Sequence, residues 1–169
     1  MNDLGFRLAE HSDAPLLVRL RDGAARWMQE QGIDQWKPGE MGEDHFRARM
    51  AEGEVWLAER NGGRVVGGWE LWWTDEPAWG VRPPDAGYVH RLMVDRATAP
   101  RGAGRAMLAE AERRIAATGR GWARLDCVTG NARLRDWYVT AGYTVVGEQP
   151  RKQGGKGSPY PVTLLEKKL

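Results

Sequence analysis

One stretch, an apolar run that ends in a glycine turn, most constrains how this chain folds. Residues 88–94 read Tyr-Val-His-Arg-Leu-Met-Val, with apolar residues on both alternating faces, which is typical of a strand in the middle of a sheet. After a short loop, Arg-Gly-Ala-Gly-Arg at 101–105 opens a segment whose apolar residues recur at helical spacing up to residue 118. A buried strand that leads through a loop into a helix predicts a sheet with helices packed against it.

Periodicity and turn residues predict the other elements. We expect a helix that follows a cap at 11–13 and ends near Gly32, further helices at 43–52, 102–118 and 131–141, and strands at 6–8, 55–59, 64–73, 122–128, 143–146 and 162–166. The segments 31–41 and 74–85 are predicted loops, and the polar, glycine-rich segment 149–161 is predicted to be mobile. Hairpins and crossover helices alternate in this order, which predicts an α/β fold of the mixed α+β kind with helices on both faces of a mixed sheet.

Composition narrows the class of protein. A chain of 169 residues suits one domain, 1–169. Lys+Arg number 25 against 23 Asp+Glu, and a net charge of +2 gives no sign of a nucleic-acid-binding protein. The single cysteine, Cys127, excludes an internal disulfide and fits a reducing compartment. The sequence offers neither an apolar run that would span a membrane nor the basic head and apolar core of a signal peptide, so we expect a cytoplasmic protein that does not bind membranes.

The glycine turn has the chemistry of an anion site. Amide groups in the first turn of a helix have no partner within the helix, and the helix dipole adds to their attraction for anions. Small residues let a phosphate approach the backbone, and Arg101 and Arg105 add positive charge. The turn is therefore a candidate pyrophosphate cradle, although a tight strand-to-helix connection explains the two glycines as well. The dinucleotide fingerprint needs a third spaced glycine, which this turn does not have.

A second motif follows in the helix predicted at 131–141. Asn131 stands at its start, Tyr138 lies two turns further on, and Gly142 and Tyr143 follow its end. Taken alone, Asn131 is explained as a helix cap and Tyr138 as a core aromatic.

Together the two motifs resemble the GNAT superfamily of N-acetyltransferases. The superfamily's pyrophosphate turn reads Gln/Arg-x-x-Gly-x-Gly/Ala, which Gly102 and Gly104 match, while Ala99 departs from the Gln/Arg position. The second motif is matched at the four positions named above. The resemblance implies a GNAT-type fold, with a mixed central sheet of about seven strands and splayed central strands that form the acetyl-CoA cleft.

The resemblance also implies the roles of particular residues. Tyr138 would protonate the departing thiolate as the general acid, and neither a metal ion nor a protein nucleophile is needed. Acetyl-CoA would be the co-substrate, held by Leu92, Met93, Val94, Arg101, Gly102, Ala103, Gly104, Arg105, Ala106 and Asn131.

The general base and the acceptor remain open at this stage. Some members of the superfamily carry a glutamate at the position of Tyr88, so Glu70 and His90 on the predicted strands are the candidates here, with a water chain as a third route. A packing role for His90 and a solvent-facing position for Glu70 are the alternatives. The two predicted loops bring Trp36 and Trp79 as candidate contacts for the acceptor, a small-molecule or peptide amine. They also carry the carboxylates of Asp34, Glu40, Asp75 and Glu76, and aromatics with carboxylates would suit a cationic amine that has an apolar body. Ordinary surface loops are the alternative.

Other functions fit the same residues. A non-catalytic acyl-CoA-binding module that regulates a partner would keep the glycine turn without needing the general acid. The same transfer to an amine is also compatible with a different acyl donor, such as succinyl-CoA. Edge strands after Tyr143 would also allow a homodimer.

Overall fold

The computed structural model describes residues 3–154 and 157–169. Residues 155–156, which belong to the segment predicted to be mobile, lie outside the described part. The elements are β1 (Leu4–Leu8), the 3₁₀ turn η1 (His11–Asp13), α1 (Ala14–Glu30), α2 (Glu43–Glu52), β2 (Glu54–Arg60), β3 (Arg64–Trp72), α3 (Glu76–Trp79), β4 (Ala86–Val94), α4 (Ala103–Ala117), β5 (Trp122–Val128), α5 (Ala132–Thr140), β6 (Thr144–Lys152) and β7 (Tyr160–Lys168). In the described ranges, no helix is both long enough and apolar enough to cross a membrane.

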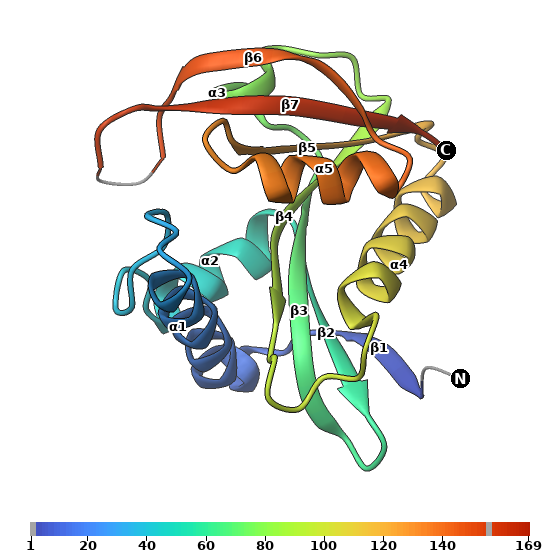
Figure 1. The fold of residues 1–169 in the computed structure, drawn as a ribbon. Coiled ribbons are helices and arrows are strands. Elements are labelled where there is room, and N and C mark those ends of the chain that lie inside the picture. Colours follow the sequence, from blue (N-terminus) through green and yellow to red (C-terminus); the bar gives the residue numbers. More distant parts are fainter. Residues whose placement is uncertain (1–2, 155–156) are drawn as a thin grey trace. The chain divides into compact units, whose positions relative to one another are not determined.

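The strands form one seven-stranded sheet in the order β1-β2-β3-β4-β5-β7-β6 (Figure 1). The pairs β1–β2, β2–β3, β5–β7 and β6–β7 are antiparallel, whereas β4 and β5 run parallel. The mixed sheet predicted from the sequence is therefore confirmed. The parallel pairing joins Ala86–Tyr88 of β4 to Trp122–Arg124 of β5.

Two compact units make up the chain, and β4 passes through both of them. The first unit holds the residues up to Leu71 together with Arg91–Ala111, and the second holds Trp72–His90 and Glu112–Leu169. Each unit has its own apolar core.

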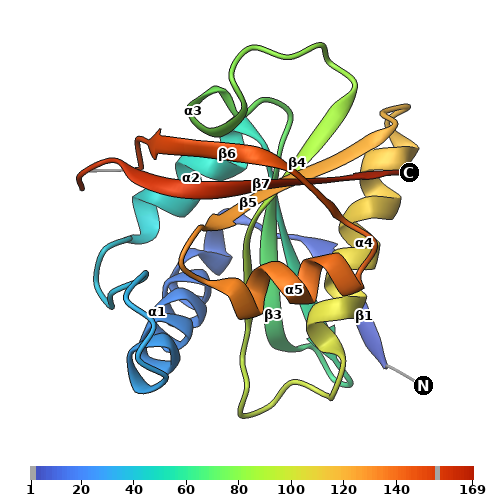
Figure 2. The same ribbon diagram turned by 45° about the horizontal axis from the view of Figure 1, so that its top comes forward.

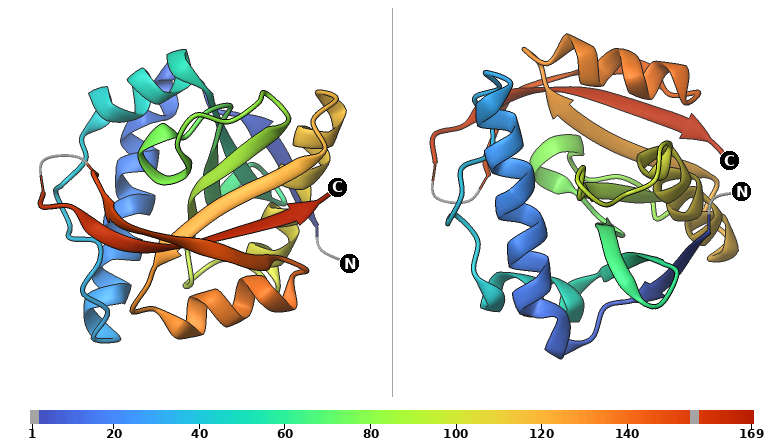
Figure 3. Two further views of the ribbon diagram at one scale, coloured as in Figure 1. Left: turned by 90° about the horizontal axis from the view of Figure 1, so that it is seen from above. Right: turned by 60° about the horizontal axis from the view of Figure 1, so that its bottom comes forward.

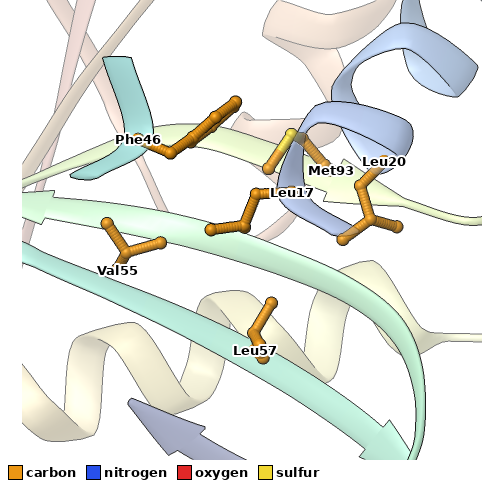
Figure 4. Packing of buried hydrophobic residues seen from close by; sticks show 6 residues of the cluster. All are labelled: Leu17, Leu20, Phe46, Val55, Leu57 and Met93. Carbon is orange, nitrogen blue, oxygen red and sulfur yellow. The ribbon is translucent and has the colours of Figure 1, made fainter. Parts of the chain in front are cut away.

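The core of the first unit forms where α1 and α2 meet the strands. Figure 4 shows Leu17 and Leu20 of α1, one turn apart, beside Val55 and Leu57 of β2, with Phe46 of α2 and Met93 of β4 completing the cluster. The helices α1 (blue) and α2 (cyan) lie side by side (Figure 3). Gly32 follows α1 with a φ of 72°, a conformation that favours glycine and terminates the helix where the sequence predicts it.

Gly67 lets β3 pack closely against its neighbours in the first unit, which leads to a test of stability. A Cβ atom at this position would lie 2.6 Å from the Met93 carbonyl oxygen and 2.7 Å from Met107 Sδ. We expect Gly67→Ala to lower the free energy of unfolding by about 1–3 kcal/mol, because the backbone oxygen cannot move away cheaply. Urea denaturation measures the change, with Gly23→Ala in α1 as the control.

The control substitution should act in the opposite direction. A Cβ atom at Gly23 meets no atom within 4 Å, and alanine favours a helix over glycine by about 1 kcal/mol. Equal stability of the wild type and Gly67→Ala would show that β3 is not as tightly packed as the distances indicate.

The second unit is built on the antiparallel strands β5, β7 and β6, with α5 running alongside them (Figure 2). Its core includes Ala78 and Trp79 of α3 together with residues of β4 and β7. One prediction is wrong here, because the predicted loop 74–85 contains α3. The segment 149–161 contains the end of β6 and the start of β7, which pair as a hairpin, and its mobility stays a prediction.

Candidate active site

In the first unit, β4 leads into the predicted glycine turn. The Asp95 carboxylate holds the connecting loop, since it accepts hydrogen bonds from the Thr98 hydroxyl at 2.6 Å and from the Ala97 amide at 3.1 Å. Gly102 has a φ of 83°, and α4 begins at the next residue. The glycine turn therefore opens a helix after a strand and a short loop, as predicted.

Two amides of this turn already have backbone partners. The Ala103 amide donates to the Pro100 carbonyl at 3.1 Å, and the Ala106 amide donates to the Gly102 carbonyl at 3.0 Å. A phosphate group held by this turn would therefore rely on the other amides, such as those of Gly102 and Gly104.

Glu70, a candidate base, lies in a buried ion pair of the first unit. Its side chain has no exposed surface, and Arg91 Nη1 lies 2.8 Å from each carboxylate oxygen. The alternative that Glu70 faces solvent is therefore wrong. Its role as a base stays a prediction, but a carboxylate held by a guanidinium is a poor acceptor for a substrate proton.

Arg91 itself has an unusual backbone conformation. Its φ is 48°, and among the described residues no other non-glycine residue has a positive φ. Such a conformation inside a strand costs of order 1–3 kcal/mol and is found at bulges and functional sites. The ion pair with Glu70 fixes the side chain of this strained residue.

His90, the other candidate base, lies in the second unit. Its ring stacks on Trp72 with centroids 3.6 Å apart, and its Nε2 atom lies 2.9 Å from Asp75 Oδ2. The side chain is 10% exposed, so it is almost buried. Burial raises the pKa of the Asp75 carboxyl, but the contact with His90 and the nearby Lys152 outweigh burial and hold that pKa below its ordinary value.

Tyr138, the predicted general acid, is buried near the end of α5. Its ring makes edge-to-face contacts with Trp137 and Tyr143, with centroid distances of 5.0 and 5.8 Å. Burial, and to a smaller extent the nearby Cys127 and Asp126, raise the pKa of the Tyr138 phenol well above its usual range. The phenol therefore keeps its proton at neutral pH, which a general acid must do.

Asn131 caps α5. Its Oδ1 atom accepts a hydrogen bond from the Leu134 amide at 3.1 Å. The cap expected from the sequence is therefore confirmed, and a contact between Asn131 and the cofactor stays a prediction.

The two tryptophans predicted to contact the acceptor have different surroundings. Trp36 is half-buried against the core of the first unit, and the Arg21 guanidinium lies 4.3 Å from its ring centroid. Arg21, with a side chain only 1% exposed, also donates hydrogen bonds to the Lys37 carbonyl and to Glu40, so it orders this loop. Trp79 is 5% exposed and packs in the core of the second unit, not in a surface loop. Acceptor binding by either ring stays a prediction.

Cys127 lies in β5 and is buried, as the sequence predicts for a core residue. Burial and the nearby Asp126 raise the pKa of its thiol to about 11. Since the thiolate is the nucleophilic form, this cysteine is not activated at neutral pH.

Of the three charged side chains that surround His90, Asp75 is among the loop carboxylates that the sequence suggests for the acceptor, whereas Asp126 and Lys152 were not selected. Asp75 precedes α3, Asp126 lies on β5 and Lys152 ends β6. One signal was available, because Asp126 is a charged residue in the middle of an otherwise buried strand. The position of Lys152 carries no such signal, since edge strands are ordinarily polar, and Asp75 was suggested only as one of several loop carboxylates.

Comparisons with known proteins give the family. The model of the acetyltransferase (GNAT) family matches residues 21–143. The chain is 28% identical to the uncharacterized N-acetyltransferase YesJ of Bacillus subtilis, over 82% of this chain and 81% of that protein. It is also similar to the crystal structure of a GNAT family acetyltransferase from Listeria monocytogenes, with 29% identity, a TM-score of 0.76, and coverage of 98% of this chain and 95% of that one.

A more distant structure has the same fold. A GNAT family acetyltransferase from Elizabethkingia anophelis, crystallised with acetyl-CoA, has a TM-score of 0.69 over the whole of both chains at 11% identity. The protein therefore belongs to the GNAT family of acetyltransferases and is an N-acetyltransferase.

Proposed function

We propose that this enzyme transfers the acetyl group of acetyl-CoA directly to the amine of a small molecule or peptide. Its membership of the family gives the reaction class. The observation that carries the proposal is the place of Tyr138, which lies buried on α5 at the motif position of the family's general acid, on the helix that Asn131 caps.

The cofactor turn has features that fit a pyrophosphate. Gly102 adopts a left-handed conformation directly before α4, and neither Gly102 nor Gly104 has a side chain that would keep a phosphate away from the backbone. The proposed contacts are the backbone groups from Arg101 to Ala106, with Leu92, Met93 and Val94 along the pantetheine arm.

Acetyl-CoA supplies the acetyl thioester. The residues of this chain would stabilise the charge that develops and transfer the protons. The Met93 or Val94 amide is the proposed donor to the carbonyl oxygen as negative charge develops on it. Tyr138 then donates its proton to the departing thiolate sulfur. Of the two candidate bases, we propose His90, because Glu70 is already held by Arg91.

Calorimetric titration with acetyl-CoA, combined with a CoA-release assay over a panel of amines, tests the proposal. We expect saturable binding of acetyl-CoA and release of CoA that depends on a primary amine. Failure to bind acetyl-CoA at millimolar concentrations would overturn the cofactor assignment. Binding without turnover on any amine would favour the alternative of a non-catalytic regulatory module.

A further inference from the structure

A buried charge cluster surrounds His90 in the second unit. We call Asp75, His90, Asp126 and Lys152 the Asp75 cluster. Their side chains are 0%, 10%, 8% and 10% exposed, respectively. One oxygen from each aspartate and one imidazole nitrogen of His90 lie within 4.8 Å of one another. Three strands and the residue before α3 therefore bring two carboxylates, an imidazole and an ammonium together away from solvent.

The Asp75 cluster lies just beyond the point where β4 and β5 part. Their parallel pairing ends with Tyr88 opposite Arg124. His90 and Asp126 each follow two residues later, so the period of a strand places them on the same face as that last pair. The cluster therefore lies just past the end of the parallel pairing, within the second unit.

Lys152 shows which ligand this environment accepts. Its Nζ atom lies 2.8 and 3.0 Å from the two oxygens of Asp126. A primary alkylammonium with its three N–H donors is therefore stabilised inside the cluster.

Asp75 is less well satisfied than Asp126. It occupies the N-cap position of α3, yet its side chain does not cap that helix. Although His90 Nε2 lies 2.9 Å from Oδ2, neither Asp75 oxygen finds a well-aligned hydrogen bond among the described residues. Opposite charge from His90 and Lys152 already compensates the buried carboxylate, and what remains unfilled is a well-aligned hydrogen bond, which a bound cationic N–H donor would supply.

We propose that the Asp75 cluster binds the acceptor as a primary alkylammonium ion beside Asp75, and that the substrates are accordingly cationic alkylamines. This inference rests on the proposed function for its reaction, although the binding step is independent of it. A divalent metal ion is the competing ligand of such a cluster. The Lys152 ammonium already holds both oxygens of Asp126, which leaves one carboxylate and one imidazole for a metal ion, fewer than the three protein ligands of a typical site.

Acetyl transfer to the bound ammonium releases one proton overall. An alkylammonium and the thioester give an amide, CoA thiol and one proton, with a C–N bond formed and the C–S bond broken. The ammonium loses two protons. One passes to His90 and from there to solvent, which leaves the amine lone pair free to attack. The second leaves the nitrogen after the C–N bond has formed and replaces, through solvent, the proton that Tyr138 has given to the departing sulfur.

Histidine ring NMR tests the binding step without any need for catalysis. The chain has three histidines, so His90→Gln assigns the His90 signals directly. We expect pentylammonium chloride to shift the His90 signals saturably in the wild type, and 1-pentanol at the same concentrations to leave them unchanged. Asp75→Asn should weaken pentylammonium binding by about 30-fold or more, because a buried charge pair loses one partner. Asp136→Asn removes an exposed carboxylate of α5 (67% exposed) and should have no effect.

The variant Lys152→Met is expected to change the affinity for pentylammonium in the opposite direction from Asp75→Asn. Lys152→Met removes the built-in ammonium and releases Asp126, so pentylammonium should bind more tightly than to the wild type. If the cluster only stabilises the fold, Lys152→Met should not bind pentylammonium more tightly than the wild type. The comparison of Lys152→Met with the wild type stays valid even if Asp75→Asn fails to fold.

The outcomes separate this inference from the proposed function. Unchanged His90 signals with pentylammonium, or a shift by stoichiometric zinc chloride in its place, would overturn the ammonium site. If Asp75→Asn changes neither acetyl-CoA binding nor turnover, the ammonium site is refuted, but the proposed acetyltransferase activity is not. Binding of pentylammonium by a protein that does not bind acetyl-CoA would refute the proposed function instead.

Discussion

Tyr138→Phe is expected to lower kcat by about 10²–10⁴-fold, the usual contribution of a positioned general acid, while acetyl-CoA binding stays unchanged. The substitution removes only the hydroxyl, so the edge-to-face contacts with Trp137 and Tyr143 are retained. Because the pKa of Tyr138 is raised, its loss of a proton should not limit the rate at neutral or mildly alkaline pH in the wild type. Rates of CoA release at saturating amine, with calorimetry for the cofactor, measure both effects.

Tyr143→Phe is the matched control. Tyr143 is also buried, at 2% exposed, and burial likewise raises the pKa of its phenol far above the ordinary range. It lies after α5 at the start of the next strand, where no role in proton transfer is proposed. We expect the kcat of Tyr143→Phe to stay within a few-fold of the wild-type kcat. Equal losses in both variants would mean that Tyr138 contributes packing and not a proton.

The fold was largely predictable because most elements have an undisturbed periodicity. The helix at 43–52 and the strand at 122–128 are confirmed at both ends. The short α3 was missed, because four residues form one turn and cannot show a helical repeat. The full length of β6 was missed because this edge strand is exposed at most positions, so no alternation of apolar and polar residues marks it.

The candidate site was predictable only where a short motif carries it. The glycine turn and Tyr138 lie on the elements that the two motifs predict. The partners of the candidate bases were not predictable, because Glu70 and Arg91 are 21 residues apart and no repeat connects them. The pairing of His90 with Asp75 likewise depends on how the segment before α3 folds back, which a sequence without regular periodicity does not reveal.

Glu70→Gln is expected to lower the free energy of unfolding by about 3–5 kcal/mol, the usual cost of removing one partner of a buried ion pair. The Glu70 side chain is fully buried, so glutamine would leave the Arg91 guanidinium without its carboxylate. Arg91 also has a strained backbone, with a φ of 48°, and the lost contact would no longer hold that conformation. Urea denaturation measures the effect.

A double variant decides whether Glu70 is a structural residue or the general base. If the pair is structural, Glu70→Gln combined with Arg91→Gln should recover part of the lost stability, since no buried charge is then left uncompensated. If Glu70 is instead the base, the single variant should keep its stability and lose kcat. That result would return proton abstraction to Glu70 and leave His90 with the binding of the ammonium alone, because the contact of His90 with Asp75 does not depend on which group takes the proton.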